Sequence, residues 1–185
     1  GAVWRFAPQW SACAASSEGF GLPDAGLVLR GVNTPGQSVS NLISLQPIVT
    51  RNNEVGLNWR GANGQFGISR YDSRSKLGSV IRIIASGVGV VERVPTTVKG
   101  WEVNGEWRPT RALSAFGSYA QTDGKTAATQ GAPMDIALGA RSQGPDKAVL
   151  GANWKWMPAS TLRLQATHLF DRDINLGRMV GTSRL

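Results

Sequence analysis

The sequence has little of what most enzymes and disulfide-bonded domains need. Of its 185 residues, one is cysteine (Cys13) and one is histidine (His168). A single cysteine cannot close an internal disulfide, and no other thiol or imidazole cluster accompanies it as metal ligands. A single histidine supplies neither a Ser-His-Asp triad nor a metal cluster. We therefore expect no catalysis, no metal site and no cofactor.

Long apolar runs and clusters of one charge are also missing. The longest apolar stretch, residues 80–91, is interrupted by Arg82 and Ser86 and falls short of the roughly 20 residues that a membrane-spanning helix requires. The net charge is +8, yet the basic residues are scattered singly, so nucleic-acid binding is not expected. No leader precedes Gly1, and any export signal is expected to have been removed or to lie outside these residues.

The sequence is rich in glycine and tryptophan, with 23 glycines and 7 tryptophans, and apolar and polar residues alternate along parts of it. In residues 101–123, apolar and polar residues alternate on both sides of a turn at residues 108–111. A period of two is typical of strands with one apolar and one polar face. Pro109 suits the turn because it fixes its own φ and cannot donate to a ladder. Phe116 departs from the alternation in the returning strand.

Three further segments repeat this layout, which indicates an internal repeat. Each has an alternating strand, a tryptophan followed by a basic residue, a tight turn and a returning strand. The segments are residues 2–20, 52–72 and 148–171. Turns are predicted around Pro8 and Pro158 and at Asn63-Gly64, a strong hairpin signal.

The connections between the repeats are long and rich in Gly, Pro, Ser, Asn and Thr. They cover residues 19–50, 73–96 and 122–146. Within the second, residues 80–84 and 88–94 predict a hairpin beyond the sheet, and the other connections are expected to be irregular loops. Alternating short and long connections between about eight strands predict an all-β, up-and-down antiparallel sheet, with the short turns on one side and the long loops on the other.

Tryptophans stand at a repeated position just before the short turns, on the apolar side of each strand. A row of tryptophans at one rim of an apolar band is what a membrane interface selects. The expected membrane-interface aromatics are Trp4, Trp59, Trp107, Trp154 and Trp156. With the polar face turned to a lumen, this pattern predicts a segment of a transmembrane β-barrel. One alternative is a soluble all-β binding module, in which the tryptophans would be core residues.

Several short motifs carry a resemblance to a known family. They are Ser17-Glu18-Gly19-Phe20 with Pro23, residues 53–60 (NEVGLNWR), residues 105–109 (GEWRP) and residues 116–123 (FGSYAQTD). In this order they resemble the barrel strands of TonB-dependent outer-membrane receptors, over most of the chain apart from the long loops.

The resemblance implies a barrel of about 22 strands that encloses an N-terminal plug domain. Such receptors import ferric siderophores, cobalamin, haem or similar ligands with energy from an inner-membrane TonB complex. Residues 1–185 are expected to be a partial barrel domain, without the plug and the C-terminal strands, of a siderophore receptor in the bacterial outer membrane. Its expected partners are outer-membrane lipid and lipopolysaccharide, an anionic ferric chelate, its own plug and the TonB complex. The other alternative is a self-contained eight-stranded outer-membrane barrel with a structural or adhesive role.

The resemblance also assigns roles to charged residues. Basic residues in the long loops are expected to attract the anionic ligand, namely Arg30, Arg82 and Arg141. Residues expected to face the lumen and hold the plug by charge pairing are Glu102, Glu106, Arg108 and Arg163. The loops carry no aromatic cluster that would single out one chelate.

Overall fold

The computed structural model describes residues 1–22, 47–83, 89–139, 142–174 and 178–180. Eight long strands form one antiparallel sheet, and a short ninth strand pairs with the end of one of them. In sheet order they are β1 (Ala2–Ala7), β2 (Trp10–Gly21), β3 (Ile48–Gly61), β4 (Gly64–Ser75), β7 (Thr96–Trp107), β8 (Leu113–Thr126), β10 (Lys147–Met157) and β11 (Ser160–Leu169). Among the described residues, no helix is long and apolar enough to cross a membrane.

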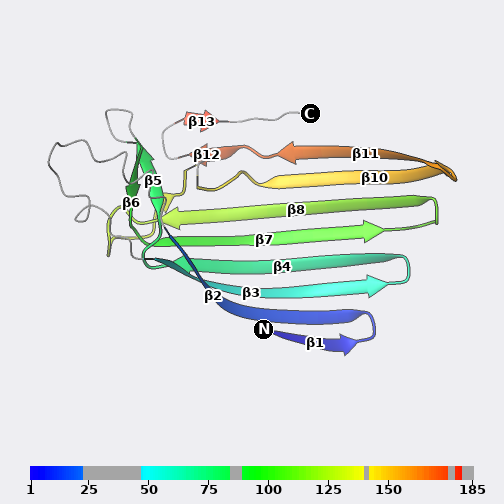
Figure 1. Cartoon of the computed structure of the whole chain (residues 1–185), viewed down its shortest axis with the longest axis horizontal. Helices are drawn as coiled ribbons and strands as arrows, with labels where there is room; N and C mark the ends of the chain where they lie inside the picture. The colour runs from blue at the N-terminus through cyan, green and yellow to red at the C-terminus, as the bar shows by residue number, and fades with distance from the viewer. Residues whose placement is uncertain (23–46, 84–88, 140–141, 175–177, 181–185) are drawn as a thin grey trace.

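The predicted up-and-down sheet is confirmed. The short turns all lie at one end, and the strand ends that the long connections join lie at the other (Figure 1). The hairpin expected within the second connection is also present, as a separate sheet of β5 (Val80–Ile83) and β6 (Gly89–Glu92). A further two-stranded sheet pairs β12 (Arg172–Ile174) with β13 (Arg178–Val180).

The third long connection is more regular than predicted. Strand β8 continues to Thr126, beyond the expected start of the loop, and β9 (Ile136–Ala137) pairs with its last residues. The irregular loop predicted from residue 122 onward was therefore wrong at its start. Residues 122–126 of β8 pair with residues 96–100 of β7, and β9 pairs with the last two of them, so their backbone groups have partners.

The short turns have two forms. Three hairpins close through two residues, Pro8-Gln9, Ala62-Asn63 and Pro158-Ala159. The hairpin predicted at Asn63-Gly64 is present, but its turn residues are Ala62 and Asn63, because Gly64 already pairs with Gly61. No described non-glycine residue has a positive φ, so neither turn residue is left-handed. The longer turn between β7 and β8 is stabilised by the Thr110 hydroxyl, which accepts from the backbone N–H groups of residues 112 and 113 at 3.2 and 3.0 Å.

Buried apolar side chains gather at the loop end, outside the long strands. Val80 and Val94 from the second connection pack with Leu138 from the third, and the partly buried Val98 of β7 packs against them. The Gln143 side chain donates to the carbonyl oxygen of Thr122 and fastens the third connection to β8. These contacts join the second and third long connections into one packed unit at the loop end of the sheet.

Neither face of the long strands is covered by a second layer in the described part of the chain (Figure 1). Trp4 is 69% exposed and Trp107 is 61% exposed. A soluble sandwich would bury one such face against a partner sheet. The tryptophans are therefore not core residues of a sandwich formed by these residues.

Candidate functional site

Register fixes which side chains share a face, because residues directly opposite each other in neighbouring strands point to the same side. We call such a line of paired residues a rung. One face carries an apolar band made by Trp4, Trp10, Ala12, Leu57, Trp59, Phe66, Ile68, Val103, Trp107, Leu113, Leu150, Trp154, Leu162 and Leu164. We call it the apolar face. The opposite face is the polar face.

The tryptophans cross the rungs on a regular diagonal. The rung of Trp4 runs across the sheet to Ala148 of β10, by way of Ala12, Leu57, Ile68, Val103 and Tyr119. Counted from this rung towards the short turns, Trp59 lies two residues further on β3, Trp107 four further on β7 and Trp154 six further on β10. These strands are two, four and six intervals away from β1, so the tryptophans shift by one residue per strand.

When the diagonal is taken as a level parallel to the membrane, the strands are tilted from the membrane normal. At about 3.4 Å per residue and about 4.8 Å between strands, one residue per strand corresponds to an angle of about 35°. Strands of transmembrane barrels tilt by about 35–45° from the membrane normal. One level through the tryptophans, as the sequence predicts, would therefore run obliquely across the rungs. Trp156 lies beside the last of them at a register shift between Lys155 and Met157.

Two aromatic positions were missed in the sequence. Trp10 pairs directly with Trp59 and belongs to the same rim. Trp101 lies on the apolar face six residues from Trp107, a separation of about 20 Å along the strand. The Arg70 guanidinium lies over the Trp101 ring at 5.1 Å from its centroid. Trp101 thus marks a second rim, and apolar bands with an aromatic rim at each edge are typical of membrane barrels.

Side chains on the polar face bind mainly to one another. Glu106 accepts from Arg108 at 2.8 and 3.0 Å and from Gln65 at 3.3 Å. The hydrogen bond and charge of Glu106 raise the pKa of the Arg108 guanidinium. Tyr71 lies over Gly100, and its hydroxyl is 2.9 Å from that of Thr122. Such cross-strand contacts pin the register of the sheet.

Phe116, which departs from the alternation, has a place on this polar face. It stands directly opposite Gly151, and a Cβ on that glycine would overlap its ring. The guanidinium of Arg163 covers the ring at 4.7 Å from the centroid. The aromatic side chain therefore fills the space that the missing side chain of Gly151 leaves.

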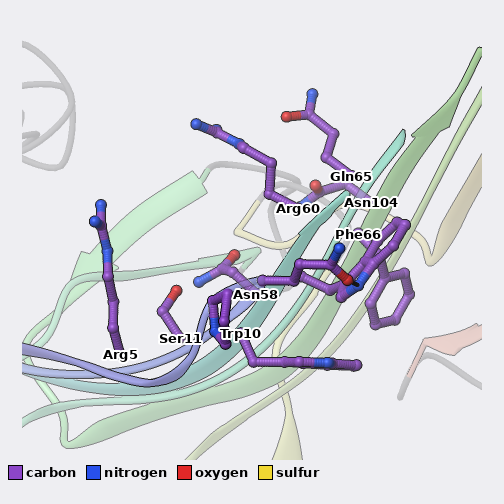
Figure 2. A pocket seen from close by; sticks show the side chains of 11 residues that line it. Arg5, Trp10, Ser11, Asn58, Arg60, Gln65, Phe66 and Asn104 are labelled. Carbon is purple, nitrogen blue, oxygen red and sulfur yellow. Dashed lines mark hydrogen bonds between the residues drawn. The ribbon is translucent and has the colours of Figure 1, made fainter. Parts of the chain in front are cut away.

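A hollow of about 540 Å³ lies at the short-turn end (Figure 2). Arg5, Ser11, Asn58, Arg60 and Gln65 point to the same side of the sheet there, from β1, β2, β3 and β4. No carboxylate lines the hollow. Within the described residues, neither arginine forms an ion pair. The polar face is therefore positive at this end, which the sequence did not indicate because three hairpins are needed to assemble it.

The predicted site residues fall into distinct places. Glu102 and Glu106 lie on the polar face of β7, Arg108 lies in the following turn, and Arg163 lies on the polar face of β11. Glu106 and Arg108 pair with each other, which neutralises both charges. Arg30 and Arg141 lie outside the described residues, and Arg82 belongs to β5. His168 lies on the apolar face, edge-on to Phe170 with centroids 4.6 Å apart.

An open antiparallel sheet with a tilted apolar band between two aromatic rims defines a segment of a transmembrane β-barrel. The family described as TonB dependent receptor-like, beta-barrel matches residues 1–181. The chain belongs to this family of outer-membrane receptors.

Solved structures show the same fold. The copper transporter OprC superposes with a TM-score of 0.74 at 17% identity, over 91% of this chain and 25% of its own. The FrpB iron transporter from Neisseria meningitidis gives 0.63 at 13% identity, over 91% of this chain and 26% of its own. BauA, the ferric preacinetobactin receptor from Acinetobacter baumannii, gives a TM-score of 0.60 at 16% identity, over 94% of this chain and 25% of its own. The chain thus spans about a quarter of the length of these proteins.

Proposed function

We propose that this chain forms part of the wall of an outer-membrane receptor that binds and imports a ferric siderophore or a similar metal chelate with energy from TonB. The observation that carries the proposal is the family match over residues 1–181. The tryptophan diagonal supports only the barrel wall, because a membrane level drawn through it gives the strands the tilt of transmembrane barrels.

The wall is proposed to continue beyond these residues. Within the described chain, the long strands β1 and β11 at the sheet edges each pair on one side only. An unpaired backbone group in lipid costs several kcal/mol, so both edges need neighbouring strands in a membrane. The similar solved proteins are about four times longer than this chain. A larger barrel is favoured over a self-contained eight-stranded one because the two edges do not meet.

The ligand side is proposed to be the end with the long connections. There Arg30, Arg82 and Arg141 would attract an anionic metal chelate through long-range electrostatics. The similar proteins include an iron transporter, a copper transporter and a ferric preacinetobactin receptor, which supports a metal-containing ligand.

The polar face is proposed to line a lumen that holds a plug domain. Glu102 and Arg163 are available for charge pairing with it, whereas Glu106 and Arg108 already pair at 2.8 Å and would offer it a dipole rather than a net charge. The apolar face would contact membrane lipid, with the row of Trp4, Trp59, Trp107, Trp154 and Trp156 at the periplasmic rim.

Growth on single metal sources tests the proposed transport. The gene that encodes the complete receptor is deleted in a strain that makes no siderophore, and growth is measured on a panel of individual ferric chelates. We expect growth to fail on one chelate, and to fail equally when TonB is deleted. Replacing Arg30, Arg82 and Arg141 together by glutamine should weaken uptake of that chelate, whereas Lys155→Gln at the opposite end should not. Unchanged growth of the deletion strain on every metal chelate would contradict the proposal.

A further inference from the structure

Four of the tryptophans near the short turns are each followed directly by a basic residue. These basic residues are Arg5, Arg60, Arg108 and Lys155. Because successive residues of a strand point to opposite faces, the cations lie on the polar side of the sheet and the tryptophans on the apolar face. The tryptophans shift by one residue per strand, so the cations follow the same diagonal. A line of cations therefore runs along the short-turn end of the polar face.

Only one of these cations is neutralised by a carboxylate. Arg108 pairs with Glu106 at 2.8 Å. Within the described residues, the other three cations form no ion pair. Glu106 shares a rung with Arg60 by way of Gln65, but the two lie two strands apart, which is about 10 Å. The positive charges of Arg5 and Arg60 are therefore available to an anion.

Arg5 and Arg60 both line the hollow at the short-turn end and point to the same side of the sheet (Figure 2). They lie two strands and two residues apart, which corresponds to about 12 Å. Both are exposed. The other polar side chains that line the hollow are neutral, namely Gln9, Ser11, Asn58, Gln65 and Asn104. The hollow thus combines two positive charges with uncharged hydrogen-bonding groups.

The size and the donors of the hollow fit a small ligand with oxyanion groups. Its volume of about 540 Å³ falls within the roughly 300–1,000 Å³ that is typical of small-molecule pockets. Guanidinium groups bind carboxylates and similar oxyanions through paired, charge-assisted hydrogen bonds. Side-chain amides and a hydroxyl add donors without adding charge. A metal chelate whose oxygen ligands leave it with a negative charge has the complementary chemistry.

We propose that the hollow is a second binding site for the anionic metal chelate, which the chelate occupies as it leaves the lumen at the short-turn end. This inference rests on the proposed function, which supplies the chelate and the direction of transport. Further out on the polar face, Glu54 and Glu102 each stand five residues before a rim tryptophan, so they share one level on the diagonal. Their carboxylates repel an anion. Arg5 and Arg60, about 17 Å nearer the short-turn end, attract the chelate past them.

The test places a fluorophore beside the hollow of the complete receptor in neutral detergent. Cys13 is the only cysteine, and its Sγ lies 3.9 Å from the side-chain amide of Asn58 in the wall of the hollow. Bimane attached to Cys13 is titrated with ferric citrate, an anionic chelate, and with ferrioxamine B, a cationic one. Both are coloured ferric complexes that quench a nearby fluorophore. Acrylamide, a small neutral quencher, reports whether the hollow is open, because a carboxylate of the expected plug domain offers the same chemistry as the chelate.

The variants Arg5→Gln, Arg60→Gln and the double variant remove the charges of the hollow. Lys155→Gln is the matched control, because Lys155 lies at the same level of the polar face but does not line the hollow. It lies four strands and four residues from Arg60, about 24 Å, which is well beyond the Debye length of about 8–10 Å. Heat-modifiable migration on gels shows that each variant has kept its barrel.

We expect each single variant to weaken ferric citrate binding about five-fold. The double variant should weaken it about 25-fold, since charges about 12 Å apart contribute additively. Lys155→Gln should leave it unchanged, and ferrioxamine B should bind much more weakly than ferric citrate. Equal affinities for the two chelates would overturn the proposal, as would equal effects of Arg60→Gln and Lys155→Gln. Acrylamide access that appears only in the double variant would assign the hollow to a plug carboxylate instead. The titration requires neither growth nor TonB, so failure of the proposed transport does not imitate any of these results.

Discussion

An arginine in the middle of the apolar band should destabilise the protein in lipid. Leu150 of β10 is 68% exposed and lies four residues from Trp154, which is about 13 Å along the strand. With a tilt of about 35°, this places Leu150 about 11 Å above the tryptophan rim. The two rims are about 17 Å apart in height on this tilt, so Leu150 sits within about 3 Å of the middle of the band.

The expected cost follows from this depth. An arginine on the lipid face costs about 2–4 kcal/mol at the bilayer midplane and falls to about 0–1 kcal/mol near the interfaces. For Leu150→Arg we therefore expect the folding equilibrium constant in lipid to fall by about 30-fold to 700-fold, at about 1.4 kcal/mol per factor of ten. On a water-facing surface the same substitution would change stability by less than about 0.5 kcal/mol.

The assay is equilibrium unfolding of the complete receptor in phosphatidylcholine vesicles, followed by tryptophan fluorescence in urea. Ser118→Arg is the matched control, because Ser118 is exposed on the polar face of β8 opposite Val149, and the shift of one residue per strand places it at the height of Leu150. It should cost less than about 1 kcal/mol. Equal destabilisation by the two variants, or a cost of less than 1 kcal/mol for Leu150→Arg, would refute the lipid-facing orientation of the apolar band.

Two further predictions concern packing. Gly151→Ala should cost about 1–3 kcal/mol, because the added methyl group overlaps the ring of Phe116. Gly105→Ala is its control, since the nearest atoms there are 3.5 Å away; a similar loss in the two variants in urea unfolding would argue against the Phe116 contact. Leu138→Ala should loosen both packed connections together, since Leu138 contacts Val80 and Val94 of the other one. Hydrogen exchange should then accelerate around residue 94 as well as residue 138, and acceleration confined to residue 138 would contradict a joint unit.

Alternation made most of the sheet predictable from the sequence. A pleated strand turns successive side chains to opposite faces, so the polarity of Glu102, Val103 and Asn104 assigned their faces without knowledge of any neighbour. The eight strands, the short turns and the β5–β6 hairpin followed from the same local signals. The family followed from the order of four short motifs.

Register was not predictable from the sequence, because it depends on which residues of two strands stand opposite each other. Trp101 was recognised as apolar, but its place at the far rim became visible only from its six-residue separation from Trp107 on a tilted strand. Phe116 looked misplaced until Gly151 was found opposite it. The hollow beside Arg5 and Arg60 is lined by residues of five strands, so it forms only when these strands are in register.

The most direct test of the account measures which face of the sheet meets lipid. Single cysteines are introduced in the complete receptor at Val103 and Asn104, neighbours on β7, after Cys13→Ser has removed the native thiol. Each is labelled with an environment-sensitive fluorophore in vesicles and exposed to a lipid-attached and a water-soluble quencher. The account predicts quenching from lipid at residue 103 and from water at residue 104. The reverse pattern, or equal access of both quenchers to both positions, would contradict it.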